Sequence, residues 1–407
     1  MGYIKKGLLG ISWWGGFRIL ARSISFIRIA ILARILAPAQ FGVFGLAALT
    51  LSSLEIITET GINVFLIQEE KNSQYINTAW VISILRGAII SLTIYSTASF
   101  ITIFFKTPEA IQILKLISVI PFIKGFTNPA IINYQKNLHF KKEVYLRSML
   151  FLVSTIVTIA LAIITTATTS LVWGLIAAAI METLFSLLFI KPLPQFKLEQ
   201  NKTKKIIKQG KWVTLTGIFN HFFMTGDDLV VSKFLGKNNL GIYQMAYKIS
   251  ILPITEIADA FGRVSFPIYS KIAKDRQRLK KAFTKTTLTI SALVIPFSVA
   301  LFVFAEQFIL IILGPKWIEA IPILKILAIF GAIRSITGSS SSVLLALKKQ
   351  REVSYITLVS FLALIISIFP LMNKFGIIGV GIATIIGSMT ALPLIIYYLR
   401  KELFYEK

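Results

Sequence analysis

The sequence of 407 residues contains no cysteine and only two histidines, His139 and His221, which lie far apart along the chain. The lack of cysteine excludes disulfides, thiolate chemistry and cysteine-based metal sites. The sequence also lacks a glycine-rich phosphate-binding loop, a cluster of His, Asp and Glu at metal-ligand spacing, and a nucleophile beside a suitable base. We therefore expect no enzyme active site, no metal and no cofactor.

Charged residues are also scarce. They make up 15% of the chain, whereas hydrophobic residues make up 55%. This balance is typical of membrane proteins. No long polar stretch remains for a separate soluble domain or an ATPase domain, so transport would have to use a gradient of ions or of substrate.

Long apolar segments recur along the whole chain. Because one crossing of the hydrocarbon core needs about 20 apolar residues, these segments predict about twelve transmembrane helices. The predicted fold is an all-α polytopic membrane protein. The predicted helices are 9–33, 43–68, 79–105, 110–134, 145–168, 170–190, 211–235, 240–268, 284–305, 319–347, 353–373 and 376–399.

The 43 lysines and arginines outnumber the 18 acidic residues, but they lie in short loops between apolar runs, which argues against nucleic-acid binding. Most loop cations fall on one side of the predicted helices, above all in 136–147, 191–211 and 271–285. Because Lys and Arg near the ends of a span resist translocation, this side is predicted to be cytoplasmic. Both termini are then cytoplasmic, and we expect a multi-pass protein of the cytoplasmic (inner) membrane.

The sequence repeats itself at long range. An offset of 199 residues places Gly42 over Gly241, and an offset of 210 places EAIQILK (109–115) over EAIPILK (319–325). Both copies keep one helix order, which predicts two parallel six-helix lobes related by an axis along the membrane normal. We predict an N-terminal lobe at 1–190, a basic cytoplasmic linker at 191–211 and a C-terminal lobe at 212–407.

Arg18 and Arg22 lie about one helical turn apart in the first predicted span. A charge inside the bilayer is costly, so it normally faces a cavity or a partner. A guanidinium can hold phosphate oxygens in pairs, and two of them on one helix face suit a pyrophosphate. Alternatively, the two arginines neutralise nearby acids or extend to the cytoplasmic surface.

Other charges inside predicted spans extend this set of candidates. The 210-residue offset pairs Lys124 with Arg334, although each of these, like Arg86, could instead neutralise a helix end. The acids could serve only as internal ion pairs, such as Glu59 with Arg22 or Asp259 with Arg263. We expect substrate binding by Arg18, Arg22, Lys124, Lys248, Arg263 and Arg334. Because a buried carboxylate can titrate near neutrality, we expect coupling to H⁺ or Na⁺ at Glu55, Glu59, Asp228 and Asp259.

The segment GISWWGGFRILARSISFIRIAILARILAPAQFGVFGLA (10–47) resembles the start of the oligosaccharide flippases, also called polysaccharide biosynthesis or O-antigen export proteins. This family is part of the multidrug, oligosaccharidyl-lipid and polysaccharide exporter superfamily, which includes lipid II flippases and multidrug and toxin extruders (MATE). One departure is Gln40, where relatives often have an acid, and it predicts a weaker cap on the second helix. The residues that match the family pattern are Trp13, Arg34, Leu36, Pro38, Phe41 and Gly42.

The resemblance implies a MATE-like fold with two lobes around a central, often cationic cavity. It also implies a flippase that moves a polyprenyl-pyrophosphate-linked oligosaccharide across the cytoplasmic membrane by alternating access, for O-antigen, capsule or exopolysaccharide synthesis. The implied partners are the lipid-linked oligosaccharide, the bilayer, and the polysaccharide polymerase and chain-length machinery. Two alternatives remain: a MATE-type cation antiporter, which would need an acidic or aromatic cavity, and a membrane polysaccharide polymerase or ligase, which would need a large outer loop.

Overall fold

The computed structural model describes the backbone of residues 3–404. Within that range it describes all side chains except those of 3–15, 17–19, 209–213, 215, 216, 220, 223, 252, 260, 263 and 404. The described chain is helical throughout and contains no strand, so the all-α prediction is confirmed. Contacts divide it into two compact units, 1–241 and 242–407. The predicted lobe and linker boundaries stay a prediction.

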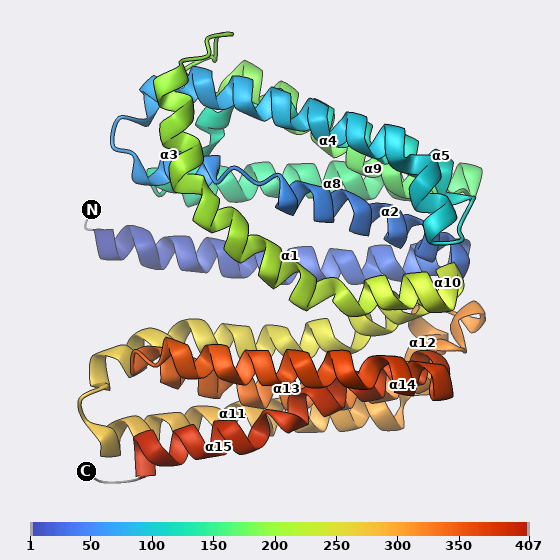
Figure 1. The fold of residues 1–407 in the computed structure, drawn as a ribbon, viewed down its shortest axis with the longest axis vertical. Helices are drawn as coiled ribbons and strands as arrows, with labels where there is room; N and C mark the ends of the chain where they lie inside the picture. The colour runs from blue at the N-terminus through green and yellow to red at the C-terminus, as the bar shows by residue number, and fades with distance from the viewer. Residues whose placement is uncertain (1–2, 405–407) are drawn as a thin grey trace. The chain divides into compact units, whose positions relative to one another are not determined.

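Unit 1 is built from long helices that run side by side, with α8 packed between α1 and α9 (Figure 1). Short helices fill the connections, and α6 packs between α4 and α9. The elements of unit 1 are α1 (Tyr3–Ile35), α2 (Pro38–Ile57), α3 (Ile62–Gln68), η1 (Asn72–Tyr75), α4 (Ile76–Phe104), α5 (Ala110–Ile117), α6 (Val119–Gly125), η2 (Pro129–Ile132), α7 (Asn133–Lys136), α8 (Phe140–Thr165), α9 (Thr169–Phe189) and the first part of α10 (Gln200–Ile272).

Unit 2 contains the rest of α10 and repeats this kind of packing, with α13 between α11 and α14. Its buried contacts include Tyr269, Leu279, Phe283 and Val343. Its other elements are α11 (Arg276–Val303), α12 (Ala305–Ile312), η3 (Pro315–Trp317), α13 (Ala320–Ala346), α14 (Gln350–Thr390), α15 (Leu392–Leu399) and η4 (Arg400–Phe404).

Seven helices in the described part are long and apolar enough to cross a membrane, or eight if the pair Ala110–Gly125 and Pro129–Lys136, bent by 75°, is one span. Many of their large apolar side chains are exposed, such as Ile164 at 77% and Ile366 at 73%. Such surfaces suit lipid rather than water. The chain is therefore a multi-pass membrane protein, while the count of twelve spans and the cytoplasmic side of both termini stay predictions.

Two glycines in left-handed conformation divide helices that would otherwise be too long for one crossing. Gly236 has φ 82° inside α10, and Gly376 has φ 57° inside α14. Glycine adopts positive φ at little cost because it has no Cβ. The breaks fall where the apolar pattern predicted one span to end and the next to begin, between 235 and 240 and between 373 and 376.

The second predicted span, 43–68, is wrong as one continuous helix. Helix α2 begins earlier, at Pro38, and ends at Ile57, and Gly61 at φ 65° turns the chain into the short helix α3. At the start of α2 the side-chain oxygen of Gln40 accepts a hydrogen bond from the backbone N–H of Ala37, at 2.8 Å. Gln40 therefore caps α2 as an acid would, and the expected weakening of this cap does not occur.

The basic segment 191–211 is anchored to unit 1 by Lys205. Its ammonium lies 2.7 Å from a carboxylate oxygen of Glu69 and 3.0 Å from the hydroxyl of Tyr75. The hydrogen bond that Lys205 donates to Glu69, and then the one that it donates to Tyr75, raise the pKa of Lys205 above its ordinary value. The contacts of Lys205 with Glu69 and Tyr75 thus attach the first turns of α10 to the rest of unit 1, on the side predicted to be cytoplasmic.

Helices α2 and α10 approach each other through the two glycines that the repeat aligns. A Cβ on Gly42 would overlap the carbonyl oxygen of Lys237, and a Cβ on Gly241 would overlap that of Pro38. Small residues allow helix backbones to pack this closely within a membrane protein. Gly42 and Gly241 are therefore required by packing, which explains why both copies of the repeat carry glycine here.

We expect Gly42→Ala to destabilise the protein by about 1–3 kcal/mol, because the added methyl group must push α2 away from α10. Thermal unfolding of the purified protein in detergent measures this loss. Gly226→Ala is the matched control, since Gly226 also lies in α10 but has no atom within 4 Å of a new Cβ. Equal melting temperatures for Gly42→Ala and the wild type would contradict this account of the contact.

Candidate functional site

Unit 1 contains a cavity of about 270 Å³ between the end of α2, α4, α6, η2 and α9. Five charged side chains contribute to its lining. A cavity with three carboxylates and two cations inside an apolar helical unit must hold its charges by pairing, by hydration or by a ligand. The five residues are Glu55, Glu59, Arg86, Lys124 and Glu182.

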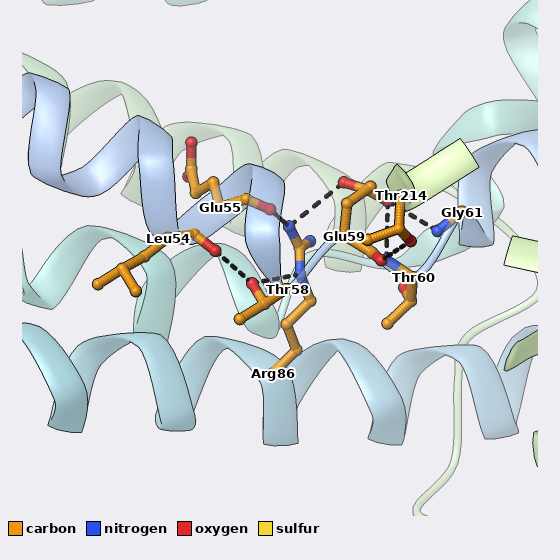
Figure 2. Close-up of polar contacts among 8 residues, drawn as sticks. All are labelled: Leu54, Glu55, Thr58, Glu59, Thr60, Gly61, Arg86 and Thr214. Atoms are coloured by element: carbon orange, nitrogen blue, oxygen red, sulfur yellow. Dashed lines mark hydrogen bonds and ion pairs between the residues drawn. The ribbon is translucent and has the colours of Figure 1, made fainter. Parts of the chain in front are cut away.

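The guanidinium of Arg86 ties α4 to the end of α2 (Figure 2). Its Nη2 lies 3.3 Å from Oε2 of Glu59 and donates to the carbonyl oxygen of Glu55 at 2.5 Å. Its Nε donates to Oγ1 of Thr58 at 3.3 Å. Arg86 therefore binds both a carboxylate and the C-terminal end of α2, where the last carbonyl groups lack partners within the helix.

The carboxylate of Glu59 is held on both oxygens. While Oε2 faces Arg86, Oε1 accepts hydrogen bonds from the backbone N–H groups of Thr60, at 3.1 Å, and Gly61, at 2.9 Å (Figure 2). The hydroxyl of Thr214 donates to the backbone carbonyl of Glu59. Glu59 is thus bonded through both carboxylate oxygens and through its backbone carbonyl, so it acts as a fixed anchor of the α2–α3 turn.

The other three charges of this cavity have no such anchor. Among the described residues, no hydrogen bond or ion pair reaches the carboxylates of Glu55 and Glu182 or the ammonium of Lys124. Figure 2 shows the Glu55 carboxylate turned away from Arg86, which contacts only its backbone oxygen. These three groups are thus available to water, ions or substrate.

Unit 2 contains a larger cavity, of about 740 Å³, between α10, α11 and α13. Among the described residues, its charged lining consists of one acid, Asp259, which is exposed, and one cation, Arg334. The Nη1 of Arg334 lies 3.3 Å from the hydroxyl of Tyr247, and its guanidinium lies 5.9 Å from the ring centre of Phe330. Hydroxyl groups of serine and threonine make up much of the remaining polar lining.

The two cavities are lined at positions that the sequence repeat aligns. The 210-residue offset pairs Lys124 on α6 with Arg334 on α13, and each lines the cavity of its own unit. The same offset pairs Gly125 with Ser335, Asn128 with Gly338 and Pro129 with Ser339. The 199-residue offset pairs Glu59 with Ala258, Thr60 with Asp259 and Asn63 with Gly262, and each of these six residues lines the cavity of its own unit.

The structure thus gathers part of the predicted site. Glu55, Glu59 and Lys124 share the cavity of unit 1, and Asp259 and Arg334 share that of unit 2. Arg22 is exposed, while Lys248 and Asp228 are partly buried and line neither cavity. The side chains of Arg18 and Arg263 lie outside the described residues, so the Asp259–Arg263 alternative stays open.

Two features of these cavities were missed from the sequence. Glu182 lines the cavity of unit 1, and its signal was a lone carboxylate within the apolar run 170–190. Arg86, considered only as a candidate cation, is the ion-pair partner of Glu59, a role for which Arg22 had been suggested. Residues so distant in sequence could not be paired before the helix packing was known.

The fold of this chain matches the folds of solved helical transporters and flippases. A solved structure of the lipid II flippase MurJ, in an inward closed conformation, matches with a TM-score of 0.77 at 17% identity and covers 96% of this chain and 88% of MurJ. An inward-facing MATE family multidrug resistance transporter matches with a TM-score of 0.70 at 14% identity, covering 94% of each chain. The predicted MATE-like class is confirmed.

Sequence comparison then gives the family. The chain belongs to the polysaccharide biosynthesis protein family, whose model matches residues 31–322. It is 23% identical to the lipopolysaccharide biosynthesis protein WzxC of Escherichia coli (strain K12), over 86% of this chain and 72% of that protein. The family indicated by the opening segment is confirmed.

Removing either partner of the Glu59–Arg86 pair should destabilise unit 1. Their side chains are 29% and 26% exposed, so we expect Arg86→Gln or Glu59→Gln to cost about 1–3 kcal/mol by leaving charged and backbone groups unpaired. The double variant should cost less than the sum of the two, because the shared interaction is lost only once.

Thermal unfolding in detergent measures all three variants. Lys124→Gln is the control, since no described residue pairs with this ammonium, and its melting temperature should match the wild type. Strict additivity of Glu59→Gln and Arg86→Gln would show that the pair contributes nothing.

Proposed function

We propose that this chain is a flippase that moves a polyprenyl-pyrophosphate-linked oligosaccharide from the cytoplasmic to the outer face of the membrane by alternating access. Its family is defined by polysaccharide biosynthesis, and a lipid II flippase shares its fold. The translocated saccharide would serve the synthesis of a surface polysaccharide such as O-antigen, capsule or exopolysaccharide. The protein is a transporter and not an enzyme, in keeping with the lipid II flippase that it resembles and with a relative named as a succinoglycan biosynthesis transport protein.

The observation that carries this proposal is the pair of repeat-equivalent cations. Lys124 and Arg334 each line the cavity of their own unit. A membrane protein retains cations at such positions only if they meet water, an acid or an anionic ligand. A pyrophosphate supplies several oxygens that a guanidinium or an ammonium can bind, and the lipid tail can stay in the bilayer.

Electrostatics also suggests how the substrate would drive the conformational change. Bringing cations together in a medium of low dielectric constant is unfavourable without an anion between them. A bound pyrophosphate would remove this cost, so it would favour the conformation in which the cations converge. Arg18, Arg22, Lys248 and Arg263 remain proposed members of this cationic set.

The expected result of neutralising the cavity cations is a loss of surface polysaccharide without a loss of protein. We expect Lys124→Gln and Arg334→Gln each to reduce surface polymer by about tenfold or more, the effect of one charge-assisted hydrogen bond or ion pair. Complementation of a deletion strain, with immunoblots for abundance, measures this. Arg18→Ala/Arg22→Ala in the same strain tests the first-helix pair.

Normal polymer from both single variants would overturn the assignment of these cations. The same strains distinguish the flippase from the main alternative, a transporter that exports organic cations. The three carboxylates of the unit 1 cavity would favour such a substrate. Drug resistance conferred by this protein, with no effect on polymer, would support that alternative and contradict the flippase.

We further propose that transport is coupled to H⁺ or Na⁺ through carboxylates. Glu55 is the strongest of the predicted candidates, because it lines a cavity and its carboxylate has no partner among the described residues. Glu182 adds a second carboxylate with the same properties. Glu59 fits less well because it is already bound on both oxygens. Asp228 and Asp259 remain proposed candidates.

Glu55→Gln/Glu182→Gln should remove the response of transport to an imposed ion gradient, because neither amide can take up a proton or balance a cation. Proteoliposomes with an imposed pH or sodium gradient measure this response. Lys401→Gln, outside the helices that line the cavities, serves as a charge-changing control. A full gradient response in the double variant would exclude these two carboxylates from coupling.

The cellular setting follows from the same proposal. We place the protein in the cytoplasmic membrane with both termini cytoplasmic, as the distribution of loop cations predicts. Delivery of the saccharide to the outer face would supply a polysaccharide polymerase and the chain-length machinery, which are the proposed functional partners.

A further inference from the structure

The cavity of unit 2 differs in chemistry from its repeat-equivalent in unit 1. Where unit 1 has Glu59 and Asn128, unit 2 has Ala258 and Gly338, and where unit 1 has Pro129, unit 2 has Ser339. At these positions unit 2 has smaller side chains and a hydroxyl group, although it has Asp259 where unit 1 has Thr60. Its volume of about 740 Å³ is well within the range of small-molecule binding sites.

The hydroxyl groups of this cavity retain hydrogen-bonding capacity. The side chains of Ser265 and Ser342 have no hydrogen bond to any described residue. The hydroxyl of Ser335 donates to the carbonyl of Ile254 at 3.3 Å, which leaves its oxygen free to accept. Groups that can both donate and accept match the hydroxyl groups of a sugar, which do the same.

Tyr269 provides an independent sign of a ligand. Its side chain is only 1% exposed, it lines the cavity, and its hydroxyl finds no partner in the described part of the chain. A buried hydroxyl without a partner is destabilising, so such groups are uncommon unless a ligand or water completes them. A lipid tail has no hydrogen-bonding group, so it could not provide this partner.

We infer that the cavity of unit 2 binds the saccharide part of the transported lipid. This inference rests on the proposed flippase function and assigns the sugar a separate subsite. Asp259 accepts hydrogen bonds from sugar hydroxyls, the serine hydroxyls contact others, and the ring of Phe266 offers an apolar surface to the C–H face of a sugar ring. Arg334 binds the adjoining phosphate or an acidic sugar.

The charge balance distinguishes this ligand from the alternatives. Among the described residues one acid and one cation line the cavity, so their charges balance and do not favour organic cations as an acidic lining would. An acyl chain would leave the buried hydroxyl of Tyr269 without a partner, which is costly. A neutral or weakly acidic saccharide satisfies both conditions.

Gly338 allows the inference to be tested without disturbing the fold. It lies in α13 on the cavity wall, and a Cβ added there would have no atom within 4 Å. Gly338→Leu therefore fills the cavity while keeping the helix. Gly226→Leu is the matched control, because Gly226 also has open space around a new Cβ but does not line this cavity.

The experiment measures binding to the purified full-length protein in lipid nanodiscs by intrinsic tryptophan fluorescence. Two probes are compared: polyprenyl pyrophosphate alone, and the lipid-linked saccharide extracted from a strain that lacks this protein. We expect the wild type to bind the saccharide-bearing probe more tightly. Gly338→Leu should reduce this preference by about tenfold or more, comparable to losing a few ligand hydrogen bonds, while Gly226→Leu keeps it.

Variants of the polar lining provide a second test of the preference for the saccharide-bearing probe. Ser265→Ala/Ser342→Ala should weaken binding of the saccharide probe by about five- to a hundredfold and leave polyprenyl pyrophosphate binding unchanged. Tyr269→Phe should weaken saccharide binding yet raise the melting temperature of the empty protein, because it removes the unpartnered hydroxyl. A purely structural tyrosine would not weaken binding.

The outcomes separate this inference from the proposed function. Equal affinity of the wild type for both probes, or an unchanged preference in Gly338→Leu, would overturn the saccharide subsite while the flippase proposal stands. Binding of neither probe by the wild type would overturn both.

Discussion

A charge inside a bilayer has to find an opposite charge, a hydrogen-bonding partner, water or a ligand. The arrangement of charged side chains in this structure depends on that constraint, because the apolar helices carry acids and bases that a lipid-facing helix would not retain. Arg86 and Glu59 meet the requirement by pairing with each other and with the end of α2. Glu55, Lys124 and Glu182 meet no described partner, which makes their cavity the functional candidate in unit 1.

The internal repeat gives each unit a cavity in an equivalent place and allows the two to differ. Lys124 and Arg334 occupy matching positions, so a cation is retained in both copies. Around these cations the cavity of unit 1 is lined by three carboxylates, whereas that of unit 2 has glycine, alanine and serine at several of the aligned positions. A duplicated scaffold can therefore assign charge-dependent steps to one copy and recognition of a neutral group to the other.

Close helix packing is the second condition for these cavities. The aligned glycines Gly42 and Gly241 let α2 and α10 pack so closely that neither position has room for a Cβ. Gln40 caps the helix that carries Glu55. The breaks at Gly236 and Gly376 depend on a conformation that glycine adopts easily. Sequence periodicity located these breaks because apolar runs must end where the chain leaves the hydrocarbon core.

The sequence by itself determined the helical membrane class, the family, the repeat and the intramembrane cations, because hydropathy, loop charge and local motifs are properties of contiguous residues. It could not determine that Glu59 pairs with Arg86, that Gly61 ends the second helix early, or that Glu182 joins Lys124. Those facts depend on which faces of distant helices meet. Helix packing is decided by the combined shape of many side chains, so only the tertiary structure could assign partners to the charges.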